Sequence, residues 1–303
     1  MVISMRRYSR YEKQEHKQGY LFLTPAVVLV SVFIGLSVLF VLYLSFHKVN
    51  LFTGSYEFVG WKNYVRLFGD DIARNGLKNT LLFSAVAVPA QTALALVISS
   101  VLNSKIKGKY FFRTVYFLPT LTSSSALTAI FMFMFSVSGP INGVLLNFHV
   151  ISKGINFLEE PSFALKVIML MNIWSTIPMY TTMYLAGLQD LPVSMYEAAQ
   201  IDGATEFGKF WYITIPYLKP ITTYVLLTSI IGTLQMFDQA YIFSNGSGGP
   251  ANSTLTVSLM VYKYAFGTQN AMGYAAAMAM VLAAIIVVIS RLAEKANGEE
   301  RIY

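Results

Sequence analysis

Six long apolar segments, separated by shorter polar ones, dominate the pattern of this sequence. They lie near residues 20–46, 80–102, 112–136, 163–188, 217–243 and 272–292. A helix of about 20 apolar residues spans the ~30 Å hydrocarbon core of a bilayer. The pattern therefore predicts an all-α integral membrane protein with six transmembrane helices.

The composition supports a membrane location. Of the 303 residues, 55% are hydrophobic and 12% are charged, and the mean hydropathy is +0.55. Soluble domains carry about 25% charged residues, so this chain has too little polar surface to face water on all sides. The net charge of +7 does not indicate nucleic-acid binding, because the basic residues cluster in short segments that flank the apolar runs.

The first apolar run predicts an uncleaved membrane helix. It extends from Tyr20 to Phe46, well beyond the roughly 7 to 15 apolar residues of a signal peptide, and no small-residue cleavage site follows it. We therefore expect a basic N-terminal segment 1–19, a six-helix transmembrane domain 20–292 and a short tail 293–303. The domain includes a polar loop, 189–216.

The distribution of Lys and Arg predicts that both termini are cytoplasmic. In that orientation 14 of the 22 basic residues lie on the inner side, where they are normally in excess. Five of the eight outer ones fall between His47 and Asn79. The polar loop 189–216 then faces the cytoplasm. The outer segment Leu255 to Phe266 is too short to span the bilayer, and we expect it to lie along the interface.

The loop between the fourth and fifth runs carries the most distinctive pattern. Residues 197–204 read E-A-A-Q-I-D-G-A, and their charges exclude them from hydrocarbon. Good helix formers at 195–200 predict a short helix, Gly203 a bend, and Thr205 to Tyr212 a second helix that ends before Pro216. An amphipathic connector without further function remains an alternative on these residues alone.

The spacing in this loop resembles the EAA motif of importer permeases of the ATP-binding cassette class. E-A-A is followed after three residues by Gly203 and after nine more by I-x-I-P, although the family usually has Leu where Ile215 stands. Further segments resemble the carbohydrate-uptake branch of that family and follow its order along the chain. They are F-V-G-W-K-N-Y at 58–64, N-T-L at 79–81, F-F-R at 111–113 with L-P at 118–119, A-G-L-Q at 186–189, and F-D at 237–238 with G-G-P at 248–250.

The resemblance implies a mechanism and partners. The loop would dock in a cleft of a cytoplasmic ATPase subunit, and closure of the ATPase dimer on ATP would move the helices from inward-open to outward-open. A homologous second permease and an external solute-binding protein would complete the importer in the plasma membrane of a bacterium or archaeon. Glu197 would pair with a cation of the ATPase, and the implied coupling residues are Glu197, Ala198, Ala199, Asp202, Gly203, Ile213 and Pro216.

Nothing in the sequence indicates ATP chemistry or a metal site. No G-x-x-x-x-G-K-[ST] pattern occurs, and Gly108-Lys109 and Gly208-Lys209 are not followed by the hydroxyl that holds magnesium. The chain has no cysteine and three scattered histidines. We therefore expect a transport subunit that is not an enzyme and holds no cofactor, with ATP and magnesium bound by the partner ATPase.

Polar residues inside the apolar runs are candidates for the solute pathway, because polar groups are costly in a membrane. The resemblance is consistent with this, since maltose-type permeases hold sugar with the third, fourth and fifth spans. Each residue has a structural alternative, because Ser and Thr bond their own helix and Asn and Gln tie helices together. The candidates are Thr120, Ser124, Asn172, Thr176, Thr233, Gln235, Met236 and Asp238.

Together these features predict the permease subunit of an ATP-driven importer for a sugar or oligosaccharide. Neutral hydroxyl and amide groups suit sugars, and sugar phosphates and polyols remain open. The alternative is a self-contained secondary transporter or channel for a small polar solute. That class normally has ionisable relays or inverted repeats within the membrane. The apolar runs of this sequence contain one carboxylate, Asp238, and no inverted repeat is visible in the sequence.

Overall fold

The computed structural model describes residues 10–50, 54–104, 108–267 and 271–298, which are mostly helical. Within these ranges, five helices are long and apolar enough to span a membrane. They are α1 (Arg10–Val30) continued through η1 (Ser31–Leu36) and α2 (Ser37–Ser45), α4 (Asp71–Asn103), α8 (Pro161–Asp190), α12 (Lys219–Leu234) with α13 (Asp238–Ser244), and α15 (Met272–Asn297). The predicted all-α membrane fold is confirmed. Parts of the predicted terminal segments, 1–9 and 299–303, and the loop residues Lys105 and Lys107 lie outside the described residues.

The predicted third span is broken. It consists of α5 (Lys109–Leu121) and α6 (Ser124–Met134), whose axes differ by 106°. The backbone is extended at Thr122 and Ser123, and the Ser123 hydroxyl accepts a hydrogen bond from the Ala126 N–H at 3.2 Å. Because Ser favours helix N-caps over helix interiors, this hydroxyl-rich segment starts a new helix and does not continue the old one.

The fifth predicted span is also interrupted. The chain leaves helical geometry between Gln235 and Phe237, where α12 ends and α13 begins. The Thr256 hydroxyl donates to the Met236 carbonyl at 3.0 Å, so a backbone group released by the break is bonded inside the bundle. Irregular backbone at membrane depth is stable only where such partners exist or where it lines a cavity.

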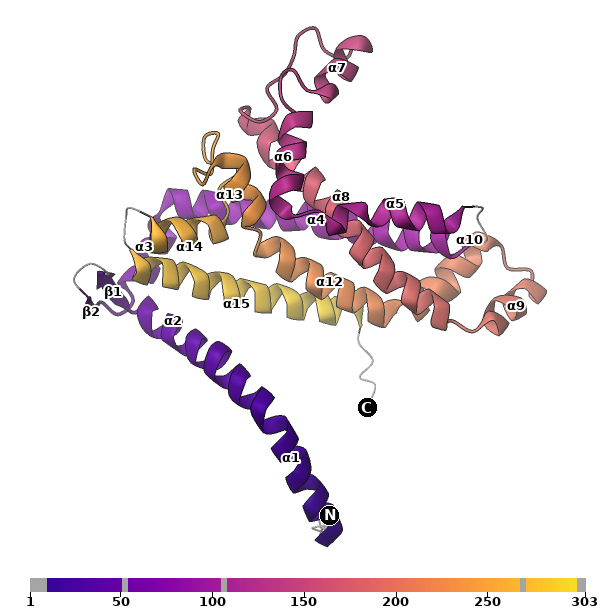
Figure 1. Ribbon diagram of the computed structural model, residues 1–303, viewed down its shortest axis with the longest axis horizontal. Coiled ribbons are helices and arrows are strands. Elements are labelled where there is room, and N and C mark those ends of the chain that lie inside the picture. The colour runs from indigo at the N-terminus through magenta and orange to yellow at the C-terminus, as the bar shows by residue number, and fades with distance from the viewer. Residues whose placement is uncertain (1–9, 51–53, 105–107, 268–270, 299–303) are drawn as a thin grey trace.

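The helices α4, α8, α12 and α15 form the centre of the bundle (Figure 1). Phe83, Ile168, Tyr184 and Leu234 are fully buried among them. A Cβ at Gly187 of α8 would collide with Leu218 and Ile221, so the glycine permits the close approach of this helix to α12. Small residues serve this purpose in membrane bundles, where the helices associate by van der Waals packing.

The segment expected along the membrane interface is packed into the bundle. It forms α14 (Val257–Phe266), which lies against α4 and α15 and buries Leu259 and Met260 almost completely. Gly76 of α4 leaves the room for this contact, because a Cβ there would lie 2.5 Å from Met260 Sδ. The interfacial position stays a prediction, since the packing partners of α14 do not determine its depth in the membrane.

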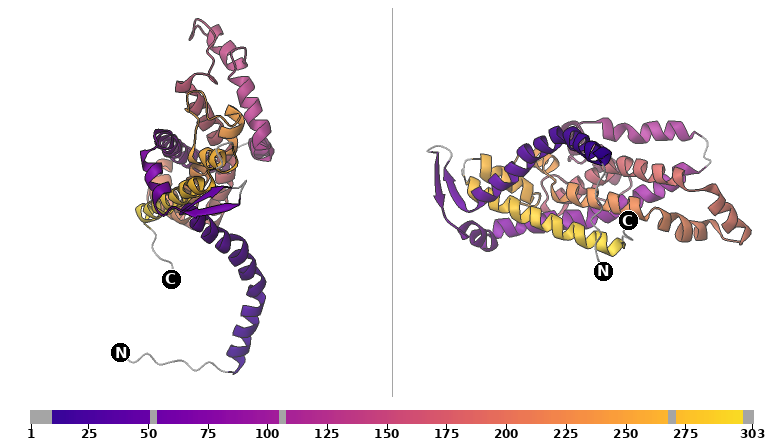
Figure 2. Two further views of the ribbon diagram at one scale, coloured as in Figure 1. Left: turned by 90° about the vertical axis from the view of Figure 1, so that its left-hand side faces the viewer. Right: turned by 90° about the horizontal axis from the view of Figure 1, so that it is seen from below.

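The N-terminal helix diverges from the bundle (Figures 1 and 2). Only its α2 end contacts α15, and most apolar side chains of α1 are exposed, as suits a helix surrounded by hydrocarbon. The antiparallel strands β1 (His47–Asn50) and β2 (Ser55–Phe58) and the helix α3 (Lys62–Gly69) follow at one end of the bundle. The short helices α9 (Val193–Ile201) and α10 (Glu206–Lys209) lie at the opposite end, and α7 (Pro140–Asn147) projects sideways beyond α6.

Candidate coupling segment and solute cavity

The loop between α8 and α12 forms a helix, a bend and a second helix, as predicted, but helical geometry continues through Pro216 and does not end before it. At the end of α9 the Ala204 N–H bonds to the Ala199 carbonyl at 2.9 Å and the Gly203 N–H to the Gln200 carbonyl at 3.1 Å. Gly203 has φ +77°, the left-handed conformation that this type of helix end requires. The Thr205 hydroxyl then accepts from the Gly208 N–H at 3.1 Å and caps α10.

One side-chain hydrogen bond joins the two arms of this loop, and another joins the loop to the end of α8. Beyond α10 the chain continues through η2 (Phe210–Thr214) and α11 (Ile215–Tyr217) into α12. The Tyr196 and Thr214 hydroxyls are 2.7 Å apart, and the Tyr217 hydroxyl donates to the carbonyl of Asp190, the last residue of α8, at 3.0 Å. We call residues 193–217 the elbow segment, because these contacts make its two arms one unit.

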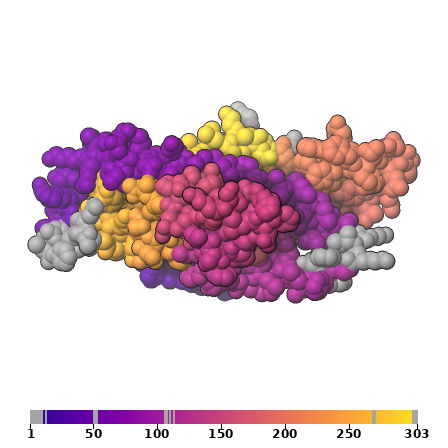
Figure 3. All heavy atoms as spheres, turned by 90° about the horizontal axis from the view of Figure 1, so that it is seen from above, coloured from indigo at the N-terminus to yellow at the C-terminus, as the bar shows by residue number. Residues whose placement is uncertain are grey.

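The elbow segment protrudes from the end of the molecule (Figure 3). Glu197 is exposed, and it has no hydrogen-bond or ion-pair partner in the part of the chain that the structure describes. Ile201 and Phe207 are 87% and 73% exposed. These side chains are therefore accessible to another molecule, although single exposed apolar residues are also common on protein surfaces. Of the other predicted coupling residues, Ala198, Asp202 and Pro216 are exposed, and Ala199 and Ile213 are half-buried.

A solvent-open cavity of about 280 Å³ lies where the interrupted fifth span meets α6 and α8. The break between α12 and α13 turns consecutive backbone and side-chain groups toward it. The cavity contains five of the eight residues predicted for the solute pathway, together with three that were not predicted. The predicted ones are Ser124, Asn172, Gln235, Met236 and Asp238, and the others are Gly232, Phe237 and Gln239.

The other three predicted residues do not line this cavity. Thr120 is exposed, and its hydroxyl donates to the Phe117 carbonyl at 2.6 Å within its own helix. Thr176 donates to Gln91 Oε1 at 2.8 Å, and the buried Thr233 donates to Ser84 Oγ at 2.9 Å. These hydroxyls therefore occupy the structural roles that Ser and Thr commonly take in membrane helices.

Gln91 is a buried polar residue that the sequence reasoning did not identify. It is 1% exposed, and it accepts from Thr176 of α8 while its Nε2 donates to Ser229 of α12. Its amide thus links α4 to both helices that wall the cavity. The signal was present in the sequence, because an amide stands alone in an apolar run two residues after Pro89.

The side chain of Asn172 is buried, and one of its two polar atoms has no partner in the described part of the chain, so it is a candidate to bind a ligand. Its Nδ2 donates to Gln239 Oε1 at 3.1 Å, whereas its Oδ1 is buried without a partner among the described residues. An unpaired buried carbonyl costs about 1–3 kcal/mol, and a hydroxyl brought by a solute would relieve that cost. Among the residues that the structure describes, no cluster of His, Asp and Glu could hold a metal ion.

Comparison with known proteins gives a consistent result. Residues 91–296 match the family model described as the binding-protein-dependent transport system inner membrane component. The chain is 39% identical to the lactose transport system permease protein LacF of Rhizobium radiobacter, over 93% of this chain and 95% of that protein. It is 34% identical to the multiple sugar-binding transport system permease protein MsmF of Streptococcus mutans, over 90% of this chain and 93% of that protein.

A solved structure shares the fold. The chain resembles one chain in the crystal structure of a bacterial alginate ABC transporter in complex with an alginate pentasaccharide-bound periplasmic protein. The TM-score is 0.77 and the sequence identity is 19%, and the match covers 92% of this chain and 93% of that chain. At this identity the likeness concerns the fold.

Proposed function

Because the chain belongs to the family of binding-protein-dependent transport system inner membrane components, we propose that it carries a sugar or oligosaccharide through the membrane in an ATP-driven importer. It is a multi-pass permease of the inner membrane and the non-catalytic component of an ABC transporter that works with a solute-binding protein. The predicted resemblance to the carbohydrate-uptake branch is confirmed by its relatives. The names of those relatives, which refer to lactose and multiple sugars, support the proposed cargo.

The protruding elbow segment carries the coupling part of the proposal. It docks on a separate ATPase subunit, with Glu197 facing a cation of that subunit and Ile201 and Phe207 contributing apolar contact. This arrangement requires both chain termini to be cytoplasmic. A homologous second permease and a dimer of the ATPase complete the importer, and ATP and magnesium are bound by the ATPase.

The connectivity of the elbow segment explains how a push on it would reach the solute. The segment joins the last residue of α8 to the first turn of α12, and it is bonded to itself across the bend. Asn172 lies on α8, and Gly232 lies on α12 beside the break. Displacing the segment would therefore move the α8 and α12 walls of the cavity together, relative to Ser124 of α6.

The polar lining of the cavity supports a neutral, hydroxyl-rich solute. Asn172 and Gln239 supply amides, Ser124 a hydroxyl and Asp238 a carboxylate, while Phe237 and Met236 add apolar surface. Sugars are bound by such combinations of hydrogen bonds and apolar contact. The opening of the cavity leaves the remaining wall to the second permease in this proposal.

Cysteine crosslinking tests the coupling proposal directly, since the native chain contains no cysteine. Glu197→Cys, in a strain that expresses the whole importer, should form an adduct with the ATPase when its thiol is labelled with a maleimide that carries a benzophenone and the sample is illuminated, since the excited benzophenone inserts into nearby C–H bonds. Glu57→Cys is the matched control, because Glu57 is also exposed but lies on β2 at the opposite end. Equal capture by both variants, or none by Glu197→Cys, would contradict the docking of the elbow segment.

Reconstitution separates the proposal from the secondary transporter. Uptake into liposomes should require the ATPase, the second permease, the binding protein and ATP. Solute accumulation driven by an ion gradient, with this chain as the sole protein in the liposome, would instead support a self-contained transporter.

A further inference from the structure

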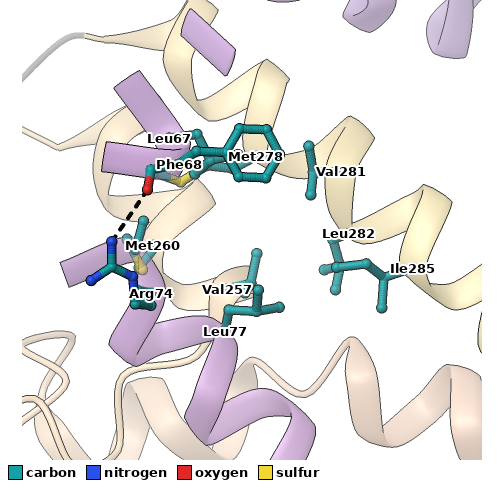
Figure 4. A pocket seen from close by; sticks show the side chains of 11 residues that line it. Leu67, Phe68, Arg74, Leu77, Val257, Met260, Met278, Val281, Leu282 and Ile285 are labelled. Atoms are coloured by element: carbon teal, nitrogen blue, oxygen red, sulfur yellow. Dashed lines mark hydrogen bonds between the residues drawn. The ribbon is translucent and has the colours of Figure 1, made fainter. Parts of the chain in front are cut away.

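An apolar cavity lies at the end of the bundle that carries α3 (Figure 4). It has a volume of about 110 Å³ and is bounded by α3, α4, α14 and α15. Apart from Arg74, its lining is apolar, and it includes Leu67, Leu77, Met260 and Leu282. An engineered apolar cavity of about 150 Å³ in another protein stays dry and binds benzene. This cavity therefore suits hydrocarbon and not water.

Arg74 lies at the edge of this cavity. Its guanidinium donates to the Phe68 carbonyl at 3.4 Å and pairs with Asp71 at 2.8 Å (Figure 4 shows the first contact). Both partners of the ion pair are largely exposed, at 67% and 88%, and such pairs contribute little stability. A guanidinium has five N–H donors, so Arg74 retains donors for an anion.

Lys78 extends the positive surface. It follows Arg74 by one helical turn on the same face of α4, is exposed, and has no hydrogen-bond or ion-pair partner among the described residues. From Lys62 to Lys78 the chain has four basic residues and two acidic ones. In the predicted orientation this cluster lies on the side of the membrane where Lys and Arg are normally scarce, so the topology rule does not account for it.

The length of α4 places these cations at the membrane surface. Its 33 residues correspond to about 50 Å, whereas the hydrocarbon core is about 30 Å thick. Because the apolar run of this helix begins near residue 80, the excess length includes its first turns, which extend into the headgroup region. Phe46, Trp61 and Tyr64 form an aromatic cluster beside the start of α3, with ring centroids 5.2 to 5.5 Å apart, and aromatic residues of this kind mark the interface.

We propose that the cavity binds part of one acyl chain of an anionic phospholipid, whose headgroup phosphate lies against Arg74 and Lys78. The cations select the anionic headgroup, and the apolar lining accepts the hydrocarbon. A protein helix is about 10 Å wide and is too large to enter a cavity of about 110 Å³. The bound lipid would connect α3, α14 and α15 at the end of the bundle remote from the elbow segment.

A photoactivatable lipid tests this site in membranes that contain the whole importer. The probe is phosphatidylglycerol with a diazirine in the acyl chain, and the adducts are located by peptide mass spectrometry. We expect adducts on Met260, Leu282 and their neighbours. We also expect Arg74→Gln to reduce them about fivefold, since one basic residue near an anionic surface contributes about that factor.

Arg291→Gln is the matched control, because Arg291 is also an exposed arginine paired with an acidic residue three positions away, but it lies on the far end of α15. Val281→Trp should exclude the acyl chain without changing the charge. Equal labelling of the Arg74→Gln and Arg291→Gln variants would overturn the proposal. So would equal labelling by a phosphatidylcholine probe, or adducts spread over the outward residues Val287 and Val288. Transport is not the measurement, so this result does not depend on the proposed cargo or coupling.

Discussion

Two carboxylate side chains of the elbow segment are exposed and have no partner in the described part of the chain, whereas most polar side chains in the centre of the bundle are buried and hydrogen-bonded. Glu197 and Asp202 are exposed, and within the described residues neither side chain has a partner. In the bundle, Gln91 bonds to Thr176 and Ser229 across three helices. Water satisfies a free carboxylate at the surface, whereas the membrane interior does not, so an unpaired polar group costs little in the elbow segment and much more in the bundle.

The comparison also identifies exceptions, because four buried side-chain atoms have no partner among the described residues: Thr92 Oγ1, Asn172 Oδ1, Ser253 Oγ and Ser290 Oγ. Most of the buried polar side chains that connect α4, α8 and α12 have partners, but Asn172 Oδ1 has none among the described residues. Of these four atoms, Asn172 Oδ1 alone belongs to a residue that lines the cavity between the broken fifth span, α6 and α8. A polar group that is left unpaired in this environment is better explained by a transient ligand than by packing alone.

Straining the bend of the elbow segment should have the largest effect of the changes considered, a loss of transport. Gly203→Val should abolish ATP-driven uptake, because a β-branched residue is strongly disfavoured at φ +77°. No atom lies within 4 Å of a Cβ at this position, so the bundle itself has room for the new side chain. Radiolabelled-solute uptake and the amount of permease in the membrane should be measured together.

Gly203→Asn is the control for that variant, since Asn tolerates the left-handed conformation best among residues with a side chain. It should retain most of the uptake. If Gly203→Val transports normally while present at the wild-type level, the bend has no part in coupling.

Removing the side-chain amide of Gln91 should have an intermediate effect, a loss of stability of the bundle. Gln91→Leu keeps a side chain of similar volume but removes the hydrogen bonds that link α4 to α8 and α12. Hydrogen bonds in membrane bundles contribute about 0.6 kcal/mol each on average. We expect a loss of about 1–2 kcal/mol of stability for the two bonds, observed as a lower midpoint of thermal unfolding in detergent. Ser100→Ala is the control, because the Ser100 hydroxyl donates only to Leu96 of its own helix. Equal midpoints for the two variants would mean that Gln91 does not brace the bundle.

The elbow segment could be predicted from the sequence because its geometry is locally encoded. Gly203 supplies the positive φ and Thr205 the cap, and every hydrogen bond that forms the bend joins residues at most five positions apart. The residue types and their spacing were sufficient for this part of the fold. The partner that the segment binds was suggested by the resemblance and not by these residues alone.

The cavity could be predicted only in part because it depends on distant contacts. The break at Met236 is stabilised by Thr256, 20 residues away, and the amide of Gln91 meets Ser229, 138 residues away. Periodicity correctly places Asn172 and Thr176 on one side of α8, but it cannot show that one lines a cavity while the other bonds to Gln91. The break after Thr122 was likewise hidden in an apolar run that is long enough to span the bilayer.

The smallest effect is expected for a substitution of Asn172, which should weaken binding of the solute. This substitution also tests the unpaired amide oxygen most directly. Asn172→Ala removes one hydrogen bond to the solute, and about 1 kcal/mol corresponds to a roughly fivefold higher solute concentration for half-maximal stimulation of the ATPase. Thr233→Ala and Thr120→Ala should leave that concentration unchanged, because their hydroxyls bond to Ser84 and to Phe117 and do not line the cavity. The assay uses the reconstituted importer with a fixed amount of the binding protein, varies the concentration of one sugar at a time, and is repeated for a series of sugars and oligosaccharides. An unchanged value for Asn172→Ala, or an equal shift in all three variants, would move the solute contacts away from α8 and leave them to the second permease.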